Sequence, residues 1–300
     1  MKYFKNNKIL VLVLFIILAI SARSISNNIR EFNMNVDSYN YRINECNTTL
    51  KNDKFYFESC KGAKEWGGPK RTDAFFTFFD ILFDDKFTIL HLLLPFLIIM
   101  CTIEKLNQKL KSGYIKNELM RKKYSSIILN EWLCSIKKLW IIPLLFTIIF
   151  IASYLLTGNF NYKSSLLNYE PWVNPIFFDN IFFSIIIYLF NFLLHGIFII
   201  NIGYIMTKKS KGYILSVLSS FIMFLGAWAF SETFFGYLIS GKLFGKPEFH
   251  NYFSFTTLWG YPEINNFLMF TLYQFILALI SSILVYKLYK NREEVLIANE

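Results

Sequence analysis

Residues 104–138 read EKLNQKLKSGYIKNELMRKKYSSIILNEWLCSIKK and separate two apolar runs, 87–103 and 139–156. This segment carries nine Lys and Arg residues and only three Glu residues. In membrane proteins, short loops rich in Lys and Arg remain on the cytoplasmic side. The segment therefore predicts a cytoplasmic loop between two transmembrane helices, and it marks the surface that a cytoplasmic partner would meet.

Long apolar runs dominate the rest of the chain. Hydrophobic residues make up 54% of its 300 residues, and 34 residues are Phe. A run of about 18 apolar residues can cross the hydrocarbon core of a bilayer as a helix. We expect an all-α integral membrane protein with a single transmembrane domain, residues 1–300, and both termini cytoplasmic. Its six transmembrane helices are expected at 9–21, 87–103, 139–156, 181–206, 213–240 and 267–286.

The charge distribution follows the same topology. The expected cytoplasmic segments are 1–8, 104–138, 207–212 and 287–300, and together they hold 18 Lys and Arg against 6 Asp and Glu. Their net charge of +12 exceeds the +10 of the whole chain, so the remaining residues are nearly neutral. Topology and anionic lipid headgroups explain the basic character, and no nucleic acid partner is expected.

The first span is shorter than the others. Residues 9–21 follow Lys2, Lys5 and Lys8, and the small residues at 19–22 also fit a signal-peptidase site. An uncleaved anchor completes an even set of six spans and is the interpretation that we adopt. A cleaved signal peptide would leave five spans.

The four Cys residues divide between the two sides of the membrane. Cys101 and Cys134 face the cytoplasm and are expected to be free thiols. Cys46 and Cys60 belong to the outer segment, 22–86. A disulfide joins these two if the outer medium is oxidising, and both remain thiols in a reducing habitat.

Residues 123–138 show helical amphipathicity. Helical phase places polar residues on one side and apolar residues on the other, which predicts an amphipathic helix on the inner leaflet that runs into the third span. The polar side holds Lys123, Asn130, Glu131, Lys137 and Lys138, and the apolar side holds Ile128, Leu129, Trp132, Leu133 and Ile136.

The last outer connection, 241–266, is too apolar for an open loop and too interrupted for a span. It contains Pro247, Trp259, Gly260 and Pro262 among aromatic residues. Non-helical backbone at membrane depth is tolerated only where protein covers its polar groups. The sequence therefore predicts re-entrant or interfacial helices before the last span.

Polar residues within the spans are the candidates for a translocation path. Asn191, His195 and Asn201 lie in the fourth span, and Glu232 lies near the outer end of the fifth. Polar groups in a span usually face the bundle or a cavity. The alternative is that the first three are hydrogen-bonded packing residues and that Glu232 reaches the outer interface.

Catalytic motifs are absent from the sequence. None of the three His residues has a metal-ligand spacing, and GKLFGK at 241–246 lacks both the spacing and the Ser or Thr of a P-loop. We expect no enzyme activity, no catalytic or metal-binding residues and no cofactor in this chain. Any ATP hydrolysis would belong to a separate subunit.

The order of elements resembles a known family. In the permeases of type-2 ABC exporters, the loop between spans two and three carries a Gly and, several residues later, an Arg that precedes a helix leading into span three. Gly113 and Arg121 in the stretch KSGYIKNELMRKKY, 111–124, match that pattern. The similarity covers most of the chain in topology and this stretch in motif, while the outer segment 22–86 is longer than in compact members.

The resemblance implies a permease subunit of an ATP-driven ABC transporter that exports a peptide, a lipid-like molecule or an amphiphilic toxic solute. Its expected partners are cytoplasmic ABC ATPase subunits, a second permease subunit, identical or homologous, and membrane lipids. The Lys, Ile, Asn and Phe bias of the composition suggests a bacterial plasma membrane. The implied contact with the ATPase is a coupling segment with Gly113, Tyr114, Lys116, Asn117, Glu118, Arg121, Lys122 and Lys123.

A second interpretation of the same sequence is a non-transporting polytopic membrane protein, such as a sensor, an immunity protein or an assembly factor. Such a protein would need no ATPase at the loop 104–138, and its basic residues would serve topology and lipid contact alone.

Overall fold

A computed structural model of the chain describes residues 8–48, 54–69, 74–82, 85–111, 124–159, 181–258 and 267–290. Within these ranges the secondary structure is helical, with no β-strand, which confirms the predicted all-α class. The α-helices are α2 (Lys8–Thr48), α3 (Lys54–Trp66), α4 (Ala74–Leu82), α5 (Asp85–Lys111), α7 (Tyr124–Lys137), α8 (Ile141–Thr157), α11 (Ile181–Lys209), α12 (Tyr213–Phe230) and α13 (Phe267–Leu288). The elements with other helical geometry are η1 (Lys138–Trp140), η2 (Ser231–Leu243), η3 (Pro247–Tyr252) and η4 (Phe255–Leu258).

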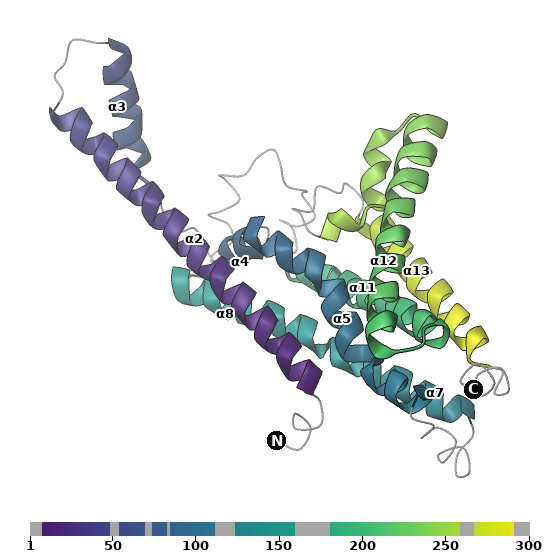
Figure 1. The fold of residues 1–300 in the computed structure, drawn as a ribbon. Helices are drawn as coiled ribbons and strands as arrows, with labels where there is room; N and C mark the ends of the chain where they lie inside the picture. Colours follow the sequence, from purple (N-terminus) through teal and green to yellow (C-terminus); the bar gives the residue numbers. More distant parts are fainter. Residues whose placement is uncertain are drawn as a thin grey trace.

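The centre of the bundle is α11, which packs against α13, α12 and α5 (Figure 1). Three of its side chains, Ile199, Ile200 and Tyr204, are fully buried. On one side of α11, α5 packs against α2 and α12, and α8 packs against α4 and α2. Apolar side chains surround α11, so its polar residues contact other helices instead of solvent.

Five helical segments are long and apolar enough to cross a membrane: Lys8–Asn47, Ser126–Thr157, Ile185–Lys209, Tyr213–Leu243 and Leu268–Leu288. The predicted second span, 87–103, lies within α5 and contains no Asp, Glu, Lys or Arg. Large apolar side chains such as Leu155 and Ile214 are exposed, whereas Asn191 and Gln274 are fully buried. An apolar exterior around a polar interior is the arrangement that lipid favours.

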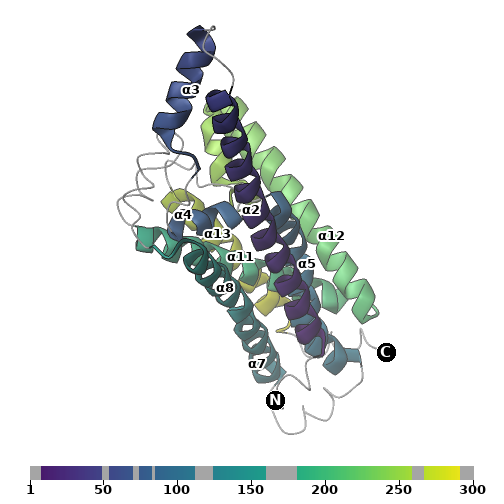
Figure 2. The same ribbon diagram turned by 90° about the vertical axis from the view of Figure 1, so that its left-hand side faces the viewer.

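Basic residues gather at one end of the bundle, which we call the basic end. Lys8 begins α2, Lys209 ends α11, Lys211 lies in the turn before α12, and Lys290 follows α13. Figures 1 and 2 show the starts of α2 and α7 and the end of α13 at this same end, with α3 at the opposite one. The helices therefore cross the bundle between a basic end and an end that carries the disulfide described below.

The first helix is much longer than the predicted span, 9–21. Its 41 residues form a rod about 60 Å long, about twice the thickness of the hydrocarbon core. The side chains that it buries recur every three or four positions and end at Asn28, namely Leu10, Val13, Ile17, Ser21, Ser24 and Asn28. The later part of α2 therefore extends beyond the bundle, where α3 packs against it.

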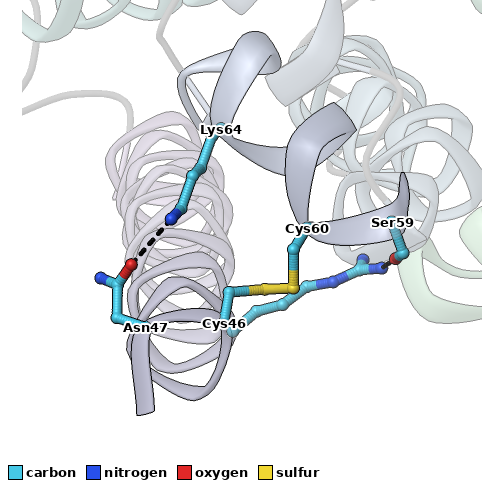
Figure 3. The surroundings of a disulfide bond; sticks show 6 residues. Cys46, Asn47, Ser59, Cys60 and Lys64 are labelled. Carbon is cyan, nitrogen blue, oxygen red and sulfur yellow. Dashed lines mark hydrogen bonds between the residues drawn. A yellow bond between two sulfur atoms is a disulfide. The ribbon is translucent and has the colours of Figure 1, made fainter. Parts of the chain in front are cut away.

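A disulfide joins Cys46 of α2 to Cys60 of α3, with their Cα atoms 5.6 Å apart (Figure 3). Lys64 Nζ also donates a hydrogen bond of 2.8 Å to Asn47 Oδ1 across the same pair of helices. The bridge spans 14 positions, and a loop of this length typically adds about 3 kcal/mol of stability by restricting the unfolded chain. The disulfide therefore fixes α3 along a part of α2 that has little other support.

We expect Cys46 and Cys60 to resist thiol alkylation until a reductant is added. The partly buried thiol Cys134 is the internal control, because it is unpaired in the structure and should react without reductant. Peptide mass spectrometry after alkylation of the intact protein measures all three. Labelling of both Cys46 and Cys60 without reductant would show that the native chain lacks this bridge.

The predicted polar and apolar sides of the helix before the third span are only partly confirmed, since Asn130 and Lys137 are exposed and Ile128 is buried. In α7, Glu131 and the following Lys138 are buried, whereas Leu129 and Leu133 are 55% and 43% exposed. Glu131 and Lys138 have partners inside the bundle, and the two leucines face outward. The predicted continuity with the third span is confirmed, since Ser126–Thr157 forms one helical segment.

The predicted fifth span, 213–240, changes geometry partway along. Residues 213–230 form the α-helix α12, and the 13 residues of η2 form a π-helix. Its wider turn is seen at its end, where the backbone N–H of Phe244 donates to the carbonyl of Ile239, five residues earlier. Two short 3₁₀ helices, η3 and η4, then pack back on η2, α13 and α11. Residues 259–266 of the predicted re-entrant or interfacial segment lie outside the described residues.

Candidate functional site

Two lysine side chains, Lys109 and Lys138, join α5 to α7 and to the residue that follows it. Lys109 Nζ of α5 lies 2.9 Å from Glu131 Oε1 of α7, and both side chains are largely buried. Just after α7, Lys138 Nζ donates a hydrogen bond to the carbonyl of Cys101 on α5. Breaking a buried ion pair by removing one partner is costly. These contacts therefore hold together the two helices that flank residues 112–123.

Hydroxyl and indole groups attach α7 to α11 and the end of α13. The hydroxyls of Ser135 and Tyr204 lie 2.9 Å apart, and the Trp132 indole donates to Asn201 Oδ1 at 2.8 Å. From beyond α13, the Tyr289 hydroxyl donates to the carbonyl of Tyr204 at 2.8 Å. At the basic end, polar contacts therefore join α5, α7, α11 and the residue after α13 into one network.

A row of polar contacts runs along the interface of α11 and α13, and we call it the α11–α13 seam. Near the basic end, Asn201 Nδ2 donates to Ser281 Oγ at 2.9 Å and to Ser282 Oγ at 3.0 Å. Interhelical hydrogen bonds of this kind are worth about 0.6 kcal/mol each in membrane proteins. The seam comprises Asn191, His195 and Asn201 on α11 and Thr271, Gln274, Ser281 and Ser282 on α13.

The other half of the seam contains buried polar atoms without a hydrogen-bond partner among the described residues. Asn191 Nδ2 lies 3.0 Å from Thr271 Oγ1, and His195 Nδ1 lies 3.2 Å from Gln274 Oε1. The unpartnered atoms are Asn191 Oδ1, His195 Nε2 and Gln274 Nε2. With Gln274 Oε1 as the acceptor, a neutral His195 would carry its proton on Nδ1 and leave Nε2 as an acceptor. These three buried atoms include donors and acceptors, and each could bind a further polar group.

A second polar cluster, the carboxylate clasp, consists of Glu232 with His250, Ser254 and Trp228. His250 Nε2 lies 2.6 Å from Glu232 Oε2. Trp228 Nε1 donates to Glu232 Oε1 at 2.9 Å, and the Ser254 hydroxyl donates to the same oxygen. The Glu232 side chain is 21% exposed. Both carboxylate oxygens are therefore occupied, and the clasp ties η2 to η3 and to the segment that follows it.

The fit between Gly236 and His250 depends on the absence of a side chain at position 236. A Cβ atom at Gly236 would lie 2.3 Å from His250 Cδ2, well inside contact distance. Gly236 belongs to the π-helix η2, a geometry that is rare and frequently found at functional sites. The His250 ring therefore packs closely against Gly236 and contacts the Glu232 carboxylate, both of which belong to η2.

Three consecutive residues connect the clasp to the α11–α13 seam. The carbonyl of Phe253 accepts a hydrogen bond of 2.6 Å from Ser231 Oγ, and Ser254 binds Glu232. The ring of Phe255, in η4, then packs on the imidazole of His195 with 4.8 Å between centroids. Movement of this segment would therefore alter the surroundings of Glu232 and of His195 together.

The structure divides the predicted translocation-path residues between these two clusters. Asn191, His195 and Asn201 are buried in the seam with the contacts of packing residues, and Glu232 lies in the clasp. Their role along a transport path stays a prediction. The predicted coupling residues, Gly113, Tyr114, Lys116, Asn117, Glu118, Arg121, Lys122 and Lys123, lie outside the described residues.

Sequence reasoning did not single out several members of these clusters. His250 and Ser254 lie 18 and 22 positions after Glu232, and Gln274 lies 79 after His195. Such separations carry no periodic signal, because helix packing alone brings the residues together. The nearest usable signal was the clustering of polar residues in otherwise apolar stretches.

The described residues contain no group of three or more His, Cys, Asp or Glu side chains that could hold a metal ion. Comparison of the chain with protein families, with curated proteins and with solved structures found no match.

Proposed function

We propose that this chain is the permease subunit of an ATP-driven ABC exporter, with six transmembrane helices and both termini in the cytoplasm. A second permease subunit, identical or homologous, and two ATPase subunits would complete the transporter. The proposed cargo is a peptide, a lipid-like molecule or an amphiphilic toxic solute. The proposed location is a bacterial plasma membrane.

The connection between residues 112–123 and the bundle is the observation that carries the proposal. The 32 residues of Ser126–Thr157 form one rod about 50 Å long that starts three residues after this stretch. The ion pair of Lys109 with Glu131 attaches the rod to α5, the helix on the other side of the stretch. An ATPase that moved residues 112–123 would therefore move two helices as one unit.

The charge of residues 112–123 supports the same proposal. Lys116, Arg121, Lys122 and Lys123 stand against one acidic residue, Glu118. Complementary charges between partners favour encounter and correct register. A basic stretch of sequence between two coupled helices is the part of the chain that we expect to meet an acidic groove on an ATPase.

The double substitution Arg121→Glu with Lys122→Glu should weaken ATPase association about tenfold. Membrane insertion should persist, because many other basic residues contribute to topology. The matched control is Lys209→Glu with Lys211→Glu, which reverses the same number of charges at the turn 209–212. Co-purification from the native membrane in mild detergent gives the readout. Equal ATPase recovery from both variants would count against the coupling assignment.

A further inference from the structure

A groove of about 600 Å³ lies between α7 and the end of α13 at the basic end. Its volume falls within the range of about 300–1,000 Å³ that is typical of small-molecule sites. The groove is open on one side, and its wall includes Ser126, Leu129 and Trp132 from α7 and Val285, Tyr286 and Lys290 from α13 and the residues after it.

The groove is polar at one end and apolar at the other. Trp132 and Ser282 share Asn201 as a hydrogen-bond partner, so they lie together in the depth of the bundle. Ser126 is near the start of α7 and Lys290 follows the end of α13, and Figure 1 shows both of these helix ends at the basic end. The lining therefore has Ser126 and Lys290 at the basic end, and its deeper part is aromatic and aliphatic apart from the hydroxyl of Ser282.

The side chains that form the apolar part present large surfaces outward. Leu129 is 55% exposed and Tyr286 is 66% exposed.

We propose that this groove binds one anionic phospholipid from the leaflet at the basic end. An acyl chain lies along Leu129, Trp132 and Val285, and the phosphate lies beside Lys290. The order of the lining groups matches an amphiphile, and basic pockets between membrane helices are known to accept anionic headgroups. The inference requires that the chain crosses a membrane, and it does not depend on an ATPase partner.

Native mass spectrometry of the full-length protein tests the proposal, with phosphatidylglycerol or phosphatidylcholine of identical acyl chains added in mild detergent. We expect one phosphatidylglycerol per chain to be retained under activation that removes phosphatidylcholine. Leu129→Glu should lower retention of phosphatidylglycerol about fivefold, and Lys290→Ala should lower its preference over phosphatidylcholine by a similar factor.

Two matched variants serve as controls. Leu133→Glu places a carboxylate one turn further along α7, and Lys209→Ala removes an exposed lysine at the same end of the bundle; neither residue lines the groove. Both should retain phosphatidylglycerol as the native chain does. Equal retention of the two lipids, or equal losses from Leu129→Glu and Leu133→Glu, would overturn the proposal. Retention that appears only after removal of residues 291–300 would also overturn it, because the chain's own tail would then be the occupant.

Discussion

Glu131→Ala should lower the stability of the purified chain by about 3 kcal/mol. The substitution removes the carboxylate 2.9 Å from Lys109 Nζ, in a place where both side chains are largely buried. An ammonium group in such surroundings is costly once its counter-charge is gone. Thermal unfolding in detergent, followed by helical circular dichroism, measures the loss.

Two comparisons isolate the ion pair in that experiment. Asn130→Ala changes the exposed neighbour of Glu131 and should have little effect. The exchange Lys109→Glu with Glu131→Lys restores opposite charges and should recover part of the lost stability. If Glu131→Ala and Asn130→Ala unfold at the same temperature, the ion pair does not hold α7 to α5.

Gly236→Leu should open the carboxylate clasp and destabilise the chain by about 1–3 kcal/mol through overpacking. Even the first atom of the new side chain would lie 2.3 Å from the His250 ring. The ring must then move away from Glu232, which loses its contact at 2.6 Å. Thermal unfolding gives the stability, and transport by the proposed exporter gives the functional consequence.

The control for this substitution lies in the same π-helix. A Cβ atom at Gly241 would meet no atom within 4 Å. Gly241→Leu therefore makes the same residue change in η2 without contacting the clasp. Gly241→Leu should unfold close to the native temperature. Equal destabilisation by both substitutions would show that η2 itself, and not the fit of His250 against Gly236, determines the effect.

The sequence predicted the helical class and the approximate positions of five helices that are long and apolar enough to cross a membrane, because long apolar runs are a strong signal. The count of six spans stays a prediction. The sequence did not predict that α2 continues to Thr48, since the later part of α2 is polar and depends on α3 and the Cys46–Cys60 bridge. The π-helix η2 was also missed, because residues 231–243 are as apolar as a regular helix and differ only in turn width.

The residues of the candidate clusters were only partly predictable, because their partners lie far apart along the chain. Asn191, His195, Asn201 and Glu232 stood out as polar residues in apolar spans. Their partners come from segments far along the chain, and Glu131 was assigned to the wrong side of its helix. Helical phase separates polar from apolar residues, but it cannot show that Lys109 would supply an internal counter-charge.

Purification of the chain from its native membrane, with identification of the proteins that accompany it, tests the central claim most directly. The account predicts a stoichiometric ABC ATPase and ATP hydrolysis that vanadate inhibits. Association of the ATPase with the chain should weaken about tenfold in the variant with Arg121→Glu and Lys122→Glu. A preparation that keeps known membrane complexes intact and yet yields no ATPase with this chain would contradict the transporter assignment.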